Sequence, residues 1–75
     1  MHAIDALRLI IEKNGLTVDE ASIVAGRNKS YFSSSFSRGS VPKADTMADL
    51  CDRLGWDLLV RDRSDGFEIN IDPKL

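Results

Sequence analysis

Basic and hydroxyl-bearing side chains are concentrated between positions 26 and 43. This segment contains no Asp or Glu, although the whole chain carries a net charge of −2. Its basic members are Arg27, Lys29, Arg38 and Lys43, and several serines lie between them. Positive charge combined with short hydrogen-bonding groups suits contacts with phosphates and with the edges of bases. A short stretch can also lack acids by chance, so the charge pattern alone leaves the function open.

The residue types needed for catalysis or for a metal site are not grouped. His2 is the only histidine and lies next to the N-terminus. Cys51 is the only cysteine, and its position on the apolar side of a predicted helix indicates a buried structural thiol. The sequence has no glycine-rich phosphate loop, paired Cys or His ligands, or converging carboxylates. We therefore expect no enzyme activity, no metal site and no cofactor.

The composition is that of one small globular domain, with 43% hydrophobic and 29% charged residues among 75. A single cysteine rules out an internal disulfide and suits a reducing compartment. No apolar stretch approaches the roughly 18–20 residues that cross a bilayer, and the first residues do not resemble a signal peptide. We expect a cytoplasmic protein without membrane contact.

Two helices are predicted before the basic segment. Residues 3–13 place apolar side chains at helical spacing, and Asn14-Gly15 ends this helix. Thr17 and Glu20 have the spacing of a capping box, which starts a second helix. Gly26 ends the second helix after about two turns.

Two further helices follow. Asn28, a favoured N-cap residue, or Arg27 is expected to open a third helix that ends before Gly39. Phe32 and Phe36 are one turn apart, so they share the side of this helix that must face the core. Its other side is polar and rich in serine, which is not a strong helix former. Residues 44–54 repeat the apolar helical spacing and form the fourth helix.

After Gly55 the hydrophobic pattern changes to period two. Residues 57–63 and 67–71 read as strands, and the intervening Ser64-Asp65-Gly66 reads as a turn. The sequence thus predicts a mainly α fold, with a four-helix domain over residues 1–56 and a β-hairpin over residues 57–72. We expect one apolar face of the hairpin to pack over the helices and Trp56 to fill the junction. The residues of that face are Leu58, Val60, Phe67, Ile69 and Ile71.

The helical part resembles the lambda-repressor/Cro-type (XRE) helix-turn-helix regulators of phages and mobile elements. The matching residues run in order through Leu16–Ala21, Ala25–Gly26, Asn28–Ser33, Arg38–Gly39 with Pro42, and Asp52–Gly55. The resemblance implies a sequence-specific transcriptional repressor that binds a palindromic DNA operator as a homodimer. It also implies that the third helix is the recognition helix in the major groove.

The resemblance assigns DNA-contact roles to individual residues. Thr17 and Val18 correspond to positions where the second helix meets the DNA backbone, and Asn28, Lys29, Ser30, Ser33 and Ser34 correspond to recognition positions. Lys29 is the expected base reader, with phosphate attraction as its alternative. Arg27 replaces an apolar residue of the family and is expected to be exposed, so that it binds phosphate together with Arg38 and Lys43. Ser37 adds a hydroxyl, and Tyr31 either contacts a phosphate or packs at the edge of the core.

The hairpin has two possible roles. Pairing with the same strand of a second copy would cover its open edge and give a homodimer through Val60, Phe67, Ile69 and Ile71. Alternatively, the hairpin is a wing whose Arg61 and Arg63 touch DNA. The nearby aspartates make the wing less attractive, so we favour dimerisation.

Two other functions use the same kind of fold. The chain could be the antitoxin of a toxin–antitoxin pair, with a toxin as its protein partner, or a protein-interaction adaptor that does not bind DNA. If the chain is a repressor, it could be the autoregulator of a small phage or mobile-element operon.

Overall fold

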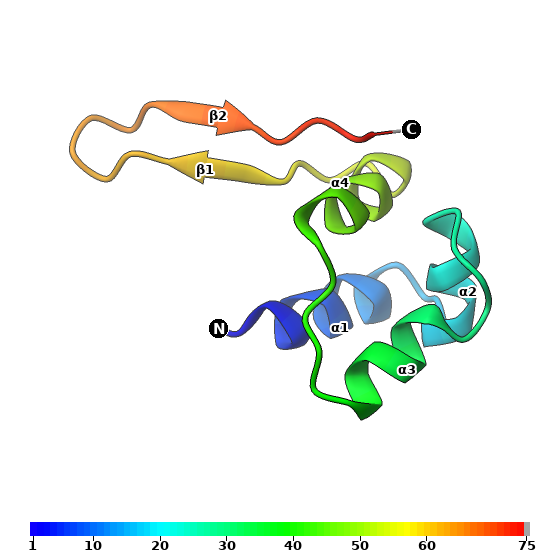
Figure 1. The fold of residues 1–75 in the computed structure, drawn as a ribbon. Coiled ribbons are helices and arrows are strands. Elements are labelled where there is room, and N and C mark those ends of the chain that lie inside the picture. Colours follow the sequence, from blue (N-terminus) through cyan, green and yellow to red (C-terminus); the bar gives the residue numbers. More distant parts are fainter. Residues whose placement is uncertain (75) are drawn as a thin grey trace.

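The computed structural model describes residues 1–74, which form four helices followed by an antiparallel hairpin (Figure 1). The prediction of a mainly α fold with a C-terminal hairpin is confirmed. The helices are α1 (Ala3–Lys13), α2 (Val18–Val24), α3 (Tyr31–Ser37) and α4 (Ala44–Arg53), and the strands are β1 (Leu59–Arg61) and β2 (Glu68–Asn70).

The core lies where the four helices meet. Phe32 of α3 is fully buried, and its ring contacts those of Tyr31 and Phe36, whose centroids lie 5.4 and 6.0 Å away. Ala21 of α2 and Ala25 at its C-cap belong to this core, and their small side chains let α3 approach closely. The other buried apolar residues are Leu7, Ile11, Ala48, Leu50 and Cys51.

The first two helices have the predicted ends. In the capping box of α2, the Thr17 side-chain oxygen accepts from the Glu20 amide at 3.1 Å, and the Thr17 amide donates to the Glu20 carboxylate at 2.9 Å. The hydrogen bond from the Thr17 amide to the carboxylate, with a smaller effect of the Thr17 side chain, holds the pKa of Glu20 below its ordinary value because it favours the charged carboxylate. Residues 17–20 therefore start α2 through local contacts alone.

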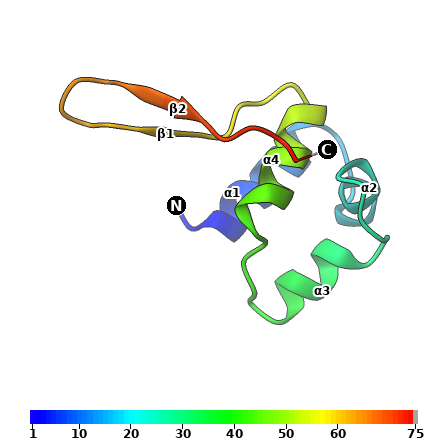
Figure 2. The same ribbon diagram turned by 45° about the horizontal axis from the view of Figure 1, so that its top comes forward.

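The strands of the hairpin are shorter than the predicted 57–63 and 67–71, and their pairing places the apolar residues on one face as predicted. Val60 lies opposite Ile69 and Arg61 lies opposite Glu68. The turn is closed by hydrogen bonds from the Asp62 amide to the Phe67 carbonyl and from the Gly66 amide back to the Asp62 carbonyl. The molecule measures 39 × 24 × 21 Å, and the hairpin projects from the helices as an arm in both views (Figures 1 and 2).

The expected packing of the hairpin over the helices is wrong. Val60, Phe67 and Ile69 are 59%, 64% and 56% exposed. Only Leu58 and Ile71, at the base of the arm, are half-buried. Period-two alternation places these side chains on one face, but it does not require the same chain to cover that face.

Both ends of the arm are attached to α4. The Trp56 amide donates to the Cys51 carbonyl at 2.8 Å just after α4 ends, and the Lys74 amide donates to the Asp49 carboxylate at 2.9 Å. The Trp56 ring lines a small hollow between α4 and the base of the hairpin, in agreement with its predicted place at the junction. The Lys13 ammonium lies 5.2 Å from the centre of the same ring.

Candidate nucleic-acid interface

The connection between α2 and α3 is a sharp turn at Gly26. Gly26 has a φ of +75°, which a residue with a Cβ seldom adopts. The Arg27 amide donates to the Ser22 carbonyl and the Gly26 amide donates to the Ile23 carbonyl, both at 2.9 Å. This pair of bonds is the Schellman motif, which ends a helix and turns the chain away from its axis.

The third helix begins later than predicted, because Asn28 makes a different local structure. Its side-chain oxygen accepts from both the amide and the hydroxyl of Ser30 at 3.0 Å. This is an Asx turn, which competes with helix capping for the same side chain. As a result α3 starts at Tyr31, and Lys29 and Ser30 lie in the turn rather than on the helix. The prediction that Asn28 caps α3 is wrong.

A buried serine that the sequence reasoning missed joins α2 to α3. The Ser22 hydroxyl, fully buried on α2, accepts from the Phe32 amide at 3.0 Å and donates to the Val18 carbonyl at 3.2 Å. Phe32 is near the start of α3, where amides have no partner within the helix. Ser22 therefore satisfies one of these amides and fixes the start of α3 against α2.

The exposed side of α3 is polar and contains no acid. Ser33 and Ser37 point to solvent, Ser34 is half-buried, and Ser35 is buried. The Ser33 hydroxyl already donates to the Ser30 carbonyl at 3.1 Å. The predicted residues Thr17, Asn28, Lys29, Ser30, Arg38 and Lys43 are all exposed.

Tyr31 had two predicted roles, and its surroundings favour packing. Its ring meets Phe32 edge to face, and the residue is half-buried against the core. Aromatic pairs of this geometry stabilise a core beyond the area that they bury.

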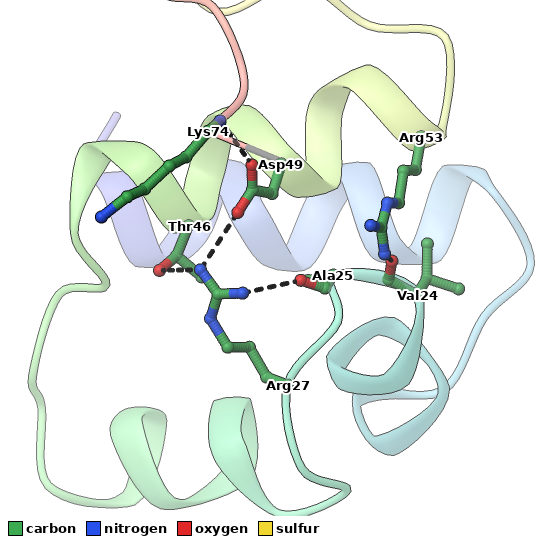
Figure 3. A network of polar contacts seen from close by, with 7 residues as sticks. All are labelled: Val24, Ala25, Arg27, Thr46, Asp49, Arg53 and Lys74. Atoms are coloured by element: carbon green, nitrogen blue, oxygen red, sulfur yellow. Dashed lines mark hydrogen bonds and ion pairs between the residues drawn. The ribbon is translucent and has the colours of Figure 1, made fainter.

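Arg27 is not free, contrary to expectation. One of its terminal nitrogens lies 3.1 Å from the Asp49 carboxylate and 3.2 Å from the Thr46 hydroxyl, and the other donates to the Ala25 carbonyl at 3.0 Å (Figure 3). The Asp49 side chain is completely buried and that of Arg27 is 26% exposed. Arg27 therefore ties the turn after α2 to α4, and it is not a candidate phosphate ligand.

A second arginine strengthens the same junction. Arg53, at the end of α4, donates to the Val24 carbonyl at the end of α2 (Figure 3). The last carbonyls of a helix lack partners within it, so a donor from α4 satisfies one of them. Together, Arg27 and Arg53 hold both sides of the α2 end against α4.

One cation next to α3 was not predicted from the sequence. The Arg8 guanidinium, on α1, lies 4.8 Å from the centre of the Phe36 ring of α3. Arg8 lies outside the basic segment, and only the three-dimensional arrangement brings it beside Ser33 and Ser37. The spacing of Arg8 from the apolar residues of α1 signalled only that it is exposed.

The thiol, the metal-ligating residue types and the helix lengths are the remaining features of the described residues that bear on function. Burial, and to a lesser extent the nearby Asp57 charge, raise the pKa of the Cys51 thiol, which keeps it protonated and unreactive. Residues 1–74 contain no group of His, Cys, Asp or Glu that could hold a metal ion. Among the same residues, no helix has the length and apolar character required to span a membrane.

Comparison of the chain with protein-family models, curated proteins and solved structures gave no match.

Proposed function

We propose that this protein is a sequence-specific DNA-binding transcriptional repressor that inserts α3 into the major groove. The main support is the exposed surface around α3, which carries positive charge and hydroxyl groups and no carboxylate between positions 26 and 43. Lys29, Arg38 and Lys43 are exposed and make no ion pair with other described residues. Such cations are available to displace the counterions of DNA phosphates.

The α2–α3 pair has the geometry that this role needs. The groove side of a recognition helix must be small or polar, and its opposite side must be anchored to the domain. In α3 the anchors are Phe32 and Phe36, and the opposite side is made of serines. Ser22 and the turn at Gly26 hold the two helices at a fixed angle, so the exposed side is presented rigidly.

Selection from random duplex DNA at about 0.1 M salt tests this function. We expect enrichment of a palindrome with half-sites about one helical turn apart. Lys29→Ala should cost roughly 1–3 kcal/mol on the preferred site and relax its specificity, whereas Arg38→Ala should weaken binding to all sequences alike. No enrichment, together with binding to proteins that is insensitive to salt, would instead support the antitoxin or adaptor function.

The salt dependence gives a second measure. With Arg27 excluded, Lys29, Arg38 and Lys43 supply six cations in a dimer, and these should contribute about −5 to the slope of log K against log salt. Arg63→Ala, at the exposed tip of the hairpin, is the matched control. Figures 1 and 2 place the hairpin and α3 on opposite sides of the helical part, so this control should keep the wild-type slope. A reduced slope for Arg63→Ala would support the wing instead.

The proposed repressor acts as a homodimer through the hairpin. Val60, Phe67 and Ile69 form an exposed apolar face on an arm, which favours a partner. β2 is the strand farther from the helices in both views (Figures 1 and 2), and its outer edge is open. Phe67 and Ile71 make their backbone hydrogen bonds with Asp62 and Leu58, on the side of β2 that pairs with β1. Backbone groups alternate along a strand, so the amides and carbonyls of Glu68 and Asn70 point to the unpaired edge.

Charge selects one register for pairing β2 with its copy. If Ile69 lies on the two-fold axis, Glu68 meets Asn70 of the partner subunit, an acceptor against an amide donor. A register centred on Glu68 places two Glu68 side chains together, and one centred on Asn70 places Glu68 against Asp72 of the partner subunit. Like charges directly opposite each other are destabilising, so the Ile69-centred register is favoured.

Sedimentation equilibrium of two variants tests the dimer. Ile69→Asp should give monomers with unchanged helix content, because Ile69 is already more than half exposed. Leu59→Asp, on the other face of the hairpin, should remain dimeric. A monomeric wild-type protein at micromolar concentration, or a dimeric Ile69→Asp, would refute this assembly.

A further inference from the structure

The surface beside α3 contains a hollow that joins three helices. It has a volume of about 300 Å³ and is lined by Arg8 of α1, Val18 of α2, and Ser33, Phe36 and Ser37 of α3. Val18 and Phe36 give it an apolar floor, and the polar groups are one guanidinium and two hydroxyls. None of these lining residues is acidic, so the hollow favours an anion.

Arg8 is held at this hollow by an aromatic ring. Its guanidinium lies over the Phe36 ring, and stacking of this kind restricts a side chain that is otherwise flexible. Asp5 and Glu12 lie one turn away on each side of Arg8, yet no ion pair joins either of them to it within the described residues. The charge of Arg8 is thus positioned and remains available to a ligand.

The two serines differ in what they can donate. The Ser33 hydroxyl donates to the Ser30 carbonyl, whereas the Ser37 side chain makes no hydrogen bond with another described residue. Ser37 is also fully on the exposed side of α3. Arg8 and Ser37 are therefore the two donors that can turn to an incoming anion.

We propose that Arg8, assisted by Ser37, binds a backbone phosphate of DNA in this hollow. The inference rests on the proposed function, since it places the phosphate next to the groove that α3 would occupy. Arginine suits this task because its planar fork of N–H groups matches phosphate geometry. Arg8 would then fix the position of α3 along the duplex without reading its sequence.

The test compares Arg8→Met with Lys13→Met in duplex binding measured from 0.05 to 0.3 M salt. Lys13 is the matched control, because it is an exposed cation on the same helix that also lies over an aromatic ring, that of Trp56. Each phosphate contact adds about 0.9 to the slope of log K against log salt. Arg8→Met should reduce the slope of a dimer by about 1.8. Over the decade from 1 M to 0.1 M salt this corresponds to a loss of roughly 60-fold in affinity for DNA at 0.1 M. Arg8→Lys should restore most of the slope.

The outcomes separate this inference from the proposed function. If the wild-type protein binds DNA and Arg8→Met keeps its slope, the phosphate site is refuted and the proposed function stands. If Arg8→Met changes preference among sequences, Arg8 reads bases and the backbone role is wrong.

A titration with inorganic phosphate distinguishes the source of the anion. We would follow the Arg8 Nε and Ser37 amide resonances of the wild type by NMR. Shifts of both on adding duplex DNA, with no shift of the Ser37 amide in Arg8→Met, support the inference. Shifts with millimolar phosphate, combined with no binding of duplex DNA, would show a site for free anions and overturn it, together with the proposed function.

Discussion

Replacing Arg27 by Met should strongly destabilise the fold, although this residue was expected to lie free on the surface. Met keeps the aliphatic stem and removes the guanidinium. The Asp49 carboxylate, which is completely buried, would then lose its cationic partner 3.1 Å away. Thr46 and the Ala25 carbonyl would lose a donor at the same time.

The size of the effect follows from this burial. Removing one partner of a buried ion pair typically costs about 3–5 kcal/mol, because the remaining charge is left in a poor solvent. Arg27 is itself about a quarter exposed, so water can reach its place and the lower end applies, about 3 kcal/mol. In a domain of this size each kcal/mol lowers the Tm by roughly 4–8 °C, which gives a fall of roughly 12–24 °C.

A double-mutant cycle measured by thermal and urea denaturation isolates the pair. Asp49→Leu alone should also be costly, since it removes the acceptor of Arg27 and of the Lys74 amide. The double variant Arg27→Met/Asp49→Leu should be less destabilised than the sum, with a coupling of about 0.5–3 kcal/mol. Arg38→Met is the matched control, because Arg38 is an exposed arginine of the same segment, and it should change stability by less than about 0.5 kcal/mol.

Two results would refute this reasoning. If Arg27→Met and Arg38→Met have the same Tm, or if the cycle is additive, the guanidinium does not hold the turn after α2 to α4. A folded Arg27→Met with a reduced salt slope for DNA would also restore Arg27 as a phosphate ligand.

Three further predictions follow from local contacts. Ser22→Ala should lower the free energy of unfolding, measured by urea titration, by about 1–3 kcal/mol, because the buried Phe32 amide loses its acceptor. Ser33→Ala on the exposed side should have little effect, and equal effects of the two variants would contradict the role of Ser22 as a cap. Cys51 should react with a thiol reagent at pH 8 only as fast as the protein unfolds, because its side chain is buried and burial also raises its pKa. A fast reaction without denaturant would contradict this burial. Hydrogen bonds with Thr17 lower the pKa of Glu20 from 4.5, so the stability that this carboxylate contributes is present above pH 4.5 and is lost as the pH falls through the folded pKa. Glu20→Gln should therefore lose less stability on acidification than the wild type.

The parts of the fold that the sequence predicted are those set by neighbouring residues. The capping box at Thr17 and the turn at Gly26 depend on contacts within a few positions, and the common face of Val60 and Ile69 follows from the alternation on each side of the hairpin turn. Their signals are caps, glycines and periodicity, which can be read along the chain.

The errors concern contacts between distant positions or between competing local structures. Arg27 and Asp49 are 22 positions apart, and only the packing of α4 on the turn brings them together. The same holds for Ser22, whose residue type gave no reason to expect a buried acceptor for α3. Asn28 can form either a helix cap or an Asx turn, and its side-chain oxygen here accepts from the Ser30 amide in an Asx turn.

The candidate site depends on the same distinction. The exposure of Lys29, Ser33 and Arg38 could be inferred from the amphipathic pattern, whereas the position of Arg8 over Phe36 could not. Arg8 lies on a helix whose own sequence indicates only an exposed charge. Three helices must pack before it becomes a neighbour of Ser37.

Asp49 connects the two surfaces on which the proposed function depends. One of its oxygens binds Arg27, which holds the turn leading into α3, and the other accepts from the Lys74 amide, where the chain returns from the hairpin (Figure 3). In a dimer joined through the hairpin, the separation of the two α3 helices would depend on how rigidly each arm is attached to its own helices. A buried carboxylate on α4 that binds both segments provides this attachment. In the proposed dimer the ion pair would thus contribute to the spacing of the two α3 helices as well as to stability, although neither Asp49 nor Arg27 would contact DNA.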